Sequence, residues 1–536
     1  MGIIDTVWDN ASPENVAIGT AAGITLYYIW FRIDEHIRIR RLGKYGPTIK
    51  HKLPLGLDFV ATSVKHTLAH TNLDLWRDVI FQATRRPTVT SRILMQRIIF
   101  TAEPENIKAM LATQFSDFGK GDPFRDEWGE FLGDSIFTTD GAQWHSSRQL
   151  LRPQFSKDRI SDLHCFEEHF LTLLKAIANG GPMNGEGQTI DLEKASGRAL
   201  DISDLFFRFT LDVTTDFLLG ADTKSLWSID NEFARAFNGV QHFQSVLSRT
   251  GNLKHFIPRY KMRRDLAVIE SFINFYIDRA LRMDQEELAT HTKSDEGYTF
   301  LHELASATRD RKRLRDQIMA ILLAGRDTTA STMSWAIYEL SRNPDMVKKL
   351  RAEILDKVGG EENAPTYEHL KNMPYIKAIL NETLRLYPVV PFNVRLALKD
   401  TTLPRGGGPD GSEPLPVLKH TPVAYSTLCM HRDPAQYPPT SETFADPDIF
   451  SPERWEHWHP KPHDYIPFNA GPRICIGQQF ALTQMSYVLV RLFQKFGRVT
   501  SHMQEIDGGN PLLKADIVLS PGQGVKVSFF EDEEKS

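Results

Sequence analysis

The sequence predicts a large, mainly α-helical domain with a minor β-sheet region, placed behind an N-terminal membrane anchor. Helical periodicity dominates residues 104–391, and its longest segment runs without a proline from Lys312 to Ser341. Residues 87–102 are rich in β-branched side chains and predict a pair of strands. Turns and short strands follow from Thr401 onward, with a closing hairpin expected over residues 516–530. Because no linker divides this body, we expect one domain.

The N-terminus differs from the body in its charge pattern. Residues 16–31 carry no charge. The charged residues before them are all acidic, and a basic segment follows them from Arg32 to Lys52. A cleavable signal peptide has the opposite order of charges. A full span needs about 20 residues, so a buried or interfacial helix is the alternative to an anchor. By the positive-inside rule we expect a lumenal segment (residues 1–15), a transmembrane helix (16–33), a basic Pro/Gly hinge (34–55) and a cytosolic body (56–536) at the endoplasmic reticulum.

Composition excludes several classes of protein. A net charge of −5 leaves no basic footprint for nucleic acid. The three cysteines form no C-x-x-C or C-x-x-C-H pattern, which excludes a disulfide scaffold, a thioredoxin motif and covalent c-type haem attachment. Residues 406–411, "GGGPDG", satisfy G-x-G-x-x-G, but a proline interrupts them and no helix is expected after them. We interpret them as a hairpin turn and expect no flavin or nicotinamide site.

One cysteine stands in an unusual turn. "FNAGPRICIGQQF" contains the pattern F-x-x-G-x-R-x-C-x-G, formed by Phe468, Gly471, Arg473, Cys475 and Gly477. Glycines let the backbone curl around the sulfur, and a helix expected from near Ile476 adds the positive end of its dipole. Both features favour a thiolate, which binds metals or attacks electrophiles. A buried, inert cysteine is the alternative, and it is what we expect of Cys165 and Cys429.

This pattern resembles the haem-ligand loop of the cytochrome P-450 superfamily, and further motifs of that family occur in order along the chain. "NETLR" supplies Glu382 and Arg385, and "SPERW" supplies Arg454. The resemblance implies a structural Glu–Arg–Arg network behind the haem; E-x-x-R alone is a common surface ion pair. "AGRDTT" lies in the middle of the longest expected helix. There the resemblance implies a dioxygen groove, with Asp327 in the proton-delivery chain and Thr328 beside the oxygen.

The resemblance also implies the cofactor and the partners. It implies the cytochrome P-450 fold and haem b (iron protoporphyrin IX) with Cys475 as the axial ligand of the metal. The other residues that match cofactor-binding motifs are Trp144, Arg148, Arg395, Phe468, Arg473 and Gly477. Dioxygen is the co-substrate, and electrons come from NADPH through a separate cytochrome P-450 reductase, with a cytochrome b-type donor as a further partner. The remaining partners are the lipid bilayer and a lipophilic small molecule.

Substrate is the least specified part of this interpretation. Residues 151–155, 401–411 and 471–492 are similar to the fungal branch that hydroxylates alkanes and fatty acids. We therefore expect terminal or near-terminal hydroxylation of long-chain fatty acids or n-alkanes. Alternatives are a tailoring hydroxylase of fungal secondary metabolism, a haem-thiolate isomerase or dehydratase that does not use dioxygen, and a non-catalytic haem-binding protein. Asp327 and Thr328 count against the last two.

Overall fold

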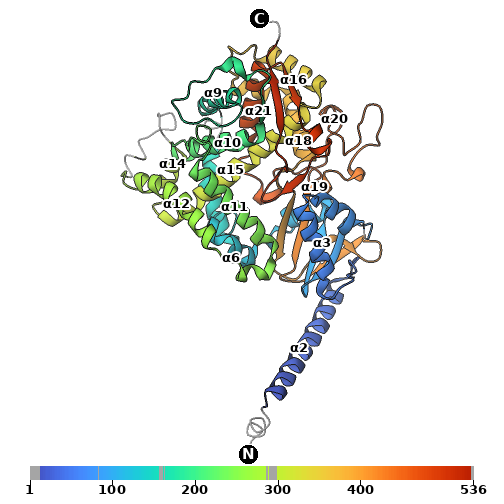
Figure 1. The fold of residues 1–536 in the computed structure, drawn as a ribbon. Coiled ribbons are helices and arrows are strands. Elements are labelled where there is room, and N and C mark those ends of the chain that lie inside the picture. The colour runs from blue at the N-terminus through green and yellow to red at the C-terminus, as the bar shows by residue number, and fades with distance from the viewer. Residues whose placement is uncertain are drawn as a thin grey trace, which may run out of the picture.

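The computed structural model describes residues 12–82, 84–155, 161, 163–284, 288 and 299–532. Most of the expected lumenal segment, residues 1–11, lies outside this description. In the described part, a helical body adjoins a sheet-rich region, and one long helix projects from the sheet-rich side (Figure 1). The predicted class, mainly helical with minor sheet, is confirmed.

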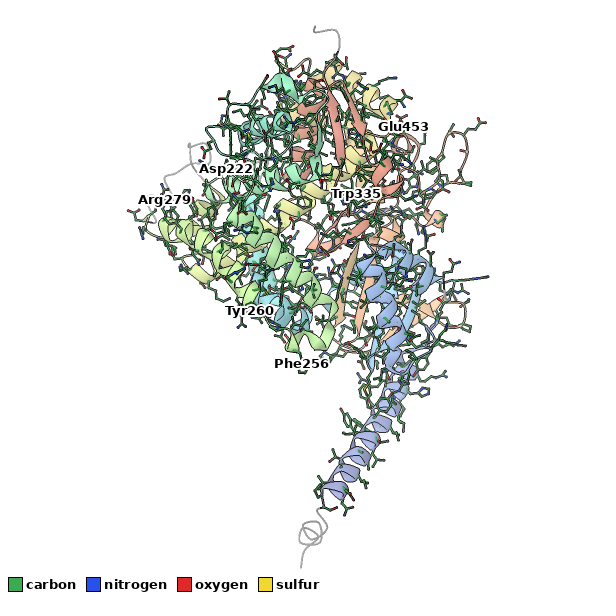
Figure 2. All side chains as sticks on the ribbon, viewed as in Figure 1. Asp222, Phe256, Tyr260, Arg279, Trp335 and Glu453 are labelled. Carbon is green, nitrogen blue, oxygen red and sulfur yellow. The ribbon has the colours of Figure 1, made fainter. Side chains whose placement is uncertain are left out.

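The helix α15 (Arg311–Leu340) runs through the middle of the body (Figure 1). Asp310 caps its first turn by accepting a hydrogen bond from the N–H of Arg313, and no proline or glycine breaks its second half. Trp335 is fully buried, lies well inside the body (Figure 2) and stacks on Tyr387 with ring centroids 4.0 Å apart. The long helix expected from Lys312 to Ser341 is thus confirmed within one residue at each end.

Two α-helices form successive layers beside α15. The helix α10 (Ile202–Leu219) packs along it, and α9 (His164–Asn179) packs on α10. The rest are α2 (Pro13–Leu42), α3 (Leu57–Leu68), α4 (Asn72–Asp74), α5 (Pro104–Lys108), α6 (Gly121–Leu132), α7 (Gly141–Leu151), α11 (Glu232–Arg249), α12 (Tyr260–Ala280), α14 (Phe300–Ala307), α16 (Pro344–Lys357), α17 (Tyr367–Lys371), α18 (Pro374–Leu386), α19 (Thr427–Met430), α20 (Arg454–His457), α21 (Gln478–Lys495) and α22 (Gln504–Asp507).

Four sheets complete the described fold. The largest has the order β1-β2-β8-β5-β3, with β2 and β8 parallel, and the others are β6-β7, β4-β12-β9 and β10-β11. The strands are β1 (Thr88–Ile93), β2 (Gln96–Thr101), β3 (Phe118–Gly119), β4 (Ala199–Asp201), β5 (Phe392–Ala397), β6 (Thr401–Gly407), β7 (Glu413–Val417), β8 (Pro422–Ser426), β9 (Arg498–Ser501), β10 (Leu513–Ala515), β11 (Leu519–Pro521) and β12 (Lys526–Phe530).

These pairings confirm two sequence predictions and overturn a third. Residues 87–102 form the pair β1 and β2, and residues 401–417 form the hairpin of β6 and β7. The closing hairpin expected over residues 516–530 is wrong, because β11 pairs with β10 whereas β12 pairs with β4 and β9. Val527 and Phe529 on β12 are fully buried in the main core, and burial there outweighs pairing with the neighbouring strand.

The helix α2 carries the apolar N-terminal segment. Ser12 caps it, Pro13 starts it, and no further proline or glycine interrupts the polar part before Gly43. It therefore includes the start of the segment expected to be a hinge. Among the described residues it is the one helix long and apolar enough to cross a membrane, and none of its apolar window is buried. At its far end Glu35 is buried against Arg92 of β1, which ties the helix to the body.

Candidate active site

The cysteine turn lies between a short 3₁₀ helix, Gly471–Arg473, and the N-terminus of α21. The N–H of Cys475 donates to the carbonyl of Phe468 (3.0 Å), which closes the loop. Gly471 has φ +67°, and an added Cβ would lie 1.8 Å from the carbonyl oxygen of Leu111, so only glycine fits there. Gly477 has φ −83°, which any residue can adopt. The expectation that this turn needs glycine therefore holds at Gly471 and not at Gly477.

The thiol of Cys475 differs from what the turn alone predicts. Cys475 as a residue is exposed, but protein atoms surround its sulfur atom. Burial of the sulfur therefore raises the pKa of the thiol. The N–H of Gly477 and the charge of Arg148 lower this pKa but do not overcome burial. The thiolate predicted from the turn is therefore not favoured by these protein groups alone. A bound metal cation would supply the missing stabilisation, because a coordinating thiol loses its proton.

Cations gather around the same loop. Arg473 lies 4.8 Å from the ring centroid of the buried Trp144 and donates to the carbonyl of Thr139 and the carboxylate of Asp140. Arg148, one turn after Trp144 on α7, donates to the carbonyl of Ile474 (3.0 Å). Burial lowers the pKa of Arg473 to about 10, with neighbouring cations adding to the shift. The loop therefore has a positively charged wall.

Two more cations extend this wall. The buried Arg395 of β5 and the half-buried Lys120 both donate to the amide oxygen of Asn393, at 2.9 and 3.1 Å. Burial, together with the charges of Arg395 and Arg473, holds the pKa of Lys120 well below its ordinary value. Within the described ranges, Asp140 is the one carboxylate that forms a salt bridge with any of these four cations. The cluster of Lys120, Arg148, Arg395 and Arg473, hereafter the cation cluster, is thus short of negative charge.

A second predicted group forms a buried network between α18 and α20. Arg385 donates through Nε and Nη2 to the two carboxylate oxygens of Glu382, both at 2.8 Å. Arg454 donates through Nε to Oε1 of the same carboxylate at 3.3 Å, and all three side chains are fully buried. Burial alone lowers the pKa of an arginine, but the charge of Glu382 outweighs it at Arg385 and raises that pKa. The two arginines also donate to backbone carbonyls of residues 431 and 445–449. The network therefore fixes the chain that leads to the cysteine turn.

The helix α15 has one accessible stripe. Between residues 316 and 340 all positions are buried except Ile321, Ala324, Gly325 and Thr328, which share one helix face. The hydroxyl of Thr328 donates to the carbonyl of Ala324 at 2.7 Å. Ile321 of this stripe and Ile476, next to the cysteine, pack against the same hydrophobic cluster. The stripe and the cysteine turn therefore each contribute a residue to the edge of one hydrophobic cluster.

Asp327 lies beside this stripe but faces elsewhere. It is almost fully buried, lies 3.1 Å from Arg326 Nη1 through Oδ1, and its Oδ2 has no hydrogen-bond partner among the described residues. Burial raises the pKa of its carboxyl, and Arg326 opposes the shift. Asp327 lines a polar cavity of about 690 Å³ between α10, α11 and the β10–β11 turn, together with Gln241 and Arg326. The cavity opens at the surface beside Asp230 and Arg235, which are mostly exposed.

Comparison with known proteins identifies the family. The family model for cytochrome P-450 matches residues 73–524. The chain belongs to the cytochrome P-450 family. It is 55% identical over 534 residues to cytochrome P-450 monooxygenase pvhE of Talaromyces variabilis, covering 100% of this chain and 99% of that protein. It is 39% identical over 524 residues to cytochrome P-450 52A12 of Debaryomyces hansenii, and 40% identical over 520 residues to cytochrome P-450 52A1 of Candida tropicalis. Those two alignments cover 94% and 93% of this chain, and 95% and 90% of the relatives.

Membership of the cytochrome P-450 family carries the enzyme class with it. The protein is a monooxygenase that uses haem with a cysteine thiolate ligand, dioxygen, and electrons supplied from NADPH by a separate reductase, and it acts on a lipophilic substrate. The donor set described above fits that cofactor. Cys475 offers a thiol that a metal would deprotonate, and the cation cluster has an excess of positive charge that two haem propionates would balance.

Sequence reasoning missed several residues of this site. Lys120 completes the cation cluster and Asp140 supplies its one ion-paired carboxylate among the described residues, but neither lies in a motif that predicts such a role. Trp455 donates to Glu382 at 3.1 Å, and its position directly after Arg454 in "PERW" was the available signal. Gln241 of α11 lines the polar cavity with Asp327, and no motif in the sequence singled it out.

Proposed function

We propose that this cytochrome P-450 hydroxylates long-chain fatty acids or n-alkanes at or near the terminal carbon, with Cys475 as the axial haem ligand. One observation supports the catalytic assignment above others. Ile321 of the accessible stripe, which also contains Thr328, and Ile476 beside Cys475 pack against the same hydrophobic cluster, and Arg148 and Arg473 of the cation cluster lie at the same turn. With a thiolate ligand, haem supplies the O–O bond cleavage and the insertion of oxygen into a C–H bond.

Several protein groups would hold the cofactor. Arg148, Arg395 and Arg473 would bind the propionates, Trp144 packs against Arg148 and Arg473, and Lys120 would add a fourth cation. Phe468 and Gly477 close the loop around the sulfur, through the carbonyl that accepts from Cys475 and the N–H that faces it. The network of Glu382, Arg385 and Arg454 holds residues 445–449 in place and so positions the cysteine segment.

In this proposal, Thr328 and Asp327 deliver protons to the active site. The hydroxyl of Thr328 lies on the accessible stripe and is oriented by the carbonyl of Ala324. Burial favours the protonated form of Asp327, and its Oδ2 is available to a water in the polar cavity. A proton entering from the surface beside Asp230 would reach Asp327 through this cavity, and Asp327 and Thr328, consecutive on α15, would together connect the cavity side of the helix with its accessible stripe.

The membrane completes the proposal. The apolar face of α2 is exposed, as are Phe256 (84%) and Tyr260 (80%), which lie toward the same lower side of the view as α2 (Figure 2). We assign residues 16–33 to a single span in the endoplasmic reticulum, residues 1–15 to the lumen, the basic segment 34–55 to the connection, and the haem domain 56–536 to the cytosol. A lipophilic substrate then enters from the bilayer, and reductase, with a cytochrome b-type donor, approaches from the cytosol.

The substrate class is tested by product analysis. The full-length chain is expressed with a fungal reductase in microsomes, supplied with NADPH, and given dodecane and lauric, palmitic and oleic acids. Mass spectrometry is expected to find terminal or near-terminal alcohols from wild type. Thr328→Ala is expected to lose product or to uncouple NADPH consumption from it. Thr332→Ala is the matched control, because Thr332 makes the same bond one turn later, to the carbonyl of Thr328 (2.8 Å), from a buried position.

The outcomes separate substrate from mechanism. An intact haem-thiolate spectrum with carbon monoxide, but no product from this panel, would refute the substrate class and favour a tailoring hydroxylase of secondary metabolism. Full product yield from Thr328→Ala would refute the proton-transfer role. A spectrum without the haem-thiolate band in Cys475→Ser, but with it in Cys429→Ser, is expected if Cys475 is the ligand.

A further inference from the structure

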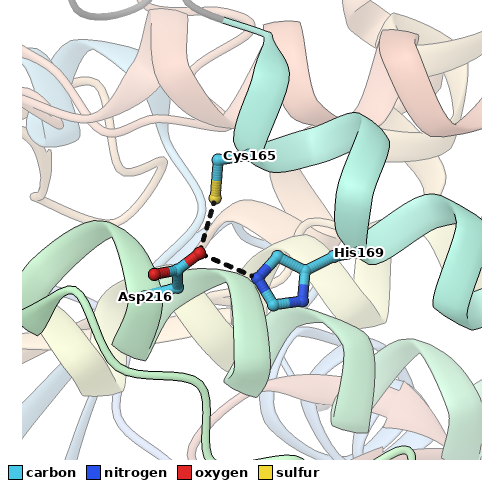
Figure 3. Close-up of side chains that lie close together, drawn as sticks. All are labelled: Cys165, His169 and Asp216. Atoms are coloured by element: carbon cyan, nitrogen blue, oxygen red, sulfur yellow. Dashed lines mark hydrogen bonds and ion pairs between the residues drawn. The ribbon is translucent and has the colours of Figure 1, made fainter. Parts of the chain in front are cut away.

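A cluster of metal-binding side chains lies away from the cysteine turn, between α9 and α10. Cys165 and His169 are four residues apart on α9 and share one face of that helix. Asp216 of α10 faces them (Figure 3). Asp216 Oδ2 lies 3.1 Å from His169 Nε2 and 3.5 Å from Cys165 Sγ. These ligand atoms all lie within 4.8 Å of one another.

Two of the three ligand separations are close to those of a zinc site, and the third, between Cys165 and His169, is at most 4.8 Å. Zinc binds sulfur at about 2.3 Å and nitrogen or oxygen at about 2.1 Å with tetrahedral angles, so adjacent N and O ligands lie about 3.4 Å apart and adjacent S and O ligands about 3.6 Å apart. The observed 3.1 and 3.5 Å differ from these values by a few tenths of an ångström. The side chains are therefore close to a binding geometry without a change in the backbone.

Charge and ligand type also favour a cation of this kind. His169 is buried, and the carboxylates of Asp212 and Asp222 act on it in addition to Asp216. A thiol, an imidazole and a carboxylate together suit zinc, whereas magnesium and calcium prefer oxygen ligands alone. The side chain of Asp216 keeps 30% of its surface exposed, so solvent reaches the group and a water can take the fourth position.

We propose that Cys165, His169 and Asp216 form a zinc site that joins α9 to α10. Binding releases the thiol proton and the proton shared between His169 and Asp216, because zinc takes the deprotonated ligands. The residues beside two of these ligands, Phe166 and Phe217, both contact Phe480 of α21, with ring centroids 5.3 and 4.6 Å away. The zinc site therefore stabilises the aromatic cluster of Phe166, Phe217 and Phe480, to which α21, the helix after the haem loop, contributes Phe480.

The test uses the full-length holoenzyme, in which haem occupies Cys475. The purified protein is incubated with one equivalent of zinc and desalted. Zinc per chain is then measured by mass spectrometry, and its ligands by X-ray absorption at the zinc edge, which haem iron does not contribute to. Wild type is expected to retain one zinc with one sulfur neighbour at about 2.3 Å, and to melt at a higher temperature with zinc than without. Cys165→Ser and Asp216→Asn are expected to bind zinc at least about tenfold more weakly.

The matched control is Cys429→Ser, which removes a half-buried thiol elsewhere in the molecule and should retain zinc like wild type. Loss of zinc from wild type on desalting, a zinc shell without sulfur, or full retention by Cys165→Ser would each overturn the site. If a variant fails to fold, as judged by its reduced carbon-monoxide spectrum, the sulfur count at the zinc edge of wild type decides the question alone.

Discussion

Replacing Glu382 with glutamine should destabilise this protein more than any other single isosteric change in its polar core. Glu382 receives hydrogen bonds from Arg385, Arg454, the N–H of Ser451 and the indole of Trp455. The side chains of Glu382 and both arginines are fully buried. Glu382→Gln keeps the shape of the side chain but leaves two buried cations without their shared counter-charge.

The expected size of the effect follows from this burial. Removing one member of a buried ion pair costs about 3–5 kcal/mol, because the remaining charge stays desolvated. The whole free energy of unfolding of a native protein is about 5–15 kcal/mol. The carbonyls of residues 445–449 that the arginines hold would also lose their fixed partners. We therefore expect Glu382→Gln to accumulate mostly without haem.

The assay combines two measurements on the variant and on a matched control. The urea midpoint reports stability, and the reduced carbon-monoxide spectrum per mole of polypeptide reports haem held by thiolate. Asp345→Asn is the control, since Asp345 pairs with Lys348 at an exposed site where such pairs contribute little. A variant Glu382→Gln with the urea midpoint and haem content of wild type would refute the reasoning.

Three further changes have defined outcomes. Gly471→Ala should abolish the haem-thiolate spectrum, because the added Cβ would overlap the Leu111 carbonyl. Gly129→Ala is the control and should keep the spectrum, because no atom lies within 4 Å of its added Cβ. Equal spectra from the two variants would contradict this reasoning. Burial raises the pKa of Asp212 to about 7, so its contribution to stability is complete below its unfolded pKa of about 3.9 and is lost as pH rises toward 7. The urea midpoint of wild type relative to Asp212→Asn should therefore fall across that interval, and a difference independent of pH would count against the shift. Removing residues 1–31 should release the protein from the microsomal pellet with its haem spectrum intact; retention in the pellet after a salt wash would disprove a sole anchor.

Local sequence predicted most of what depends on local physics. The long helix α15 follows from a run without proline, and β1 with β2 follows from β-branched residues on either side of a turn. Family membership was predictable from the cysteine turn together with the motifs around Glu382 and Asp327, and the family comparison confirms it. The apolar character of α2 was equally plain from its residues.

Other features required the folded molecule. The partners of β12 are β4 and β9, because burial in a distant core decides pairing between strands that are separated in sequence. The pKa of Cys475 is raised, since desolvation depends on every atom packed near the sulfur and not on the glycines beside it. Lys120 joins the cation cluster from a segment without any motif.

By itself, then, the sequence determined the fold class, the family and the apolar N-terminal helix, because each depends on residue types at short, regular spacings. Only the tertiary structure decided which distant side chains share a site. Asp216 meets Cys165 and His169 solely because α9 and α10 pack together. Long-range contacts of this kind carry no periodic signal along the chain, since they are set by the packing of a whole core.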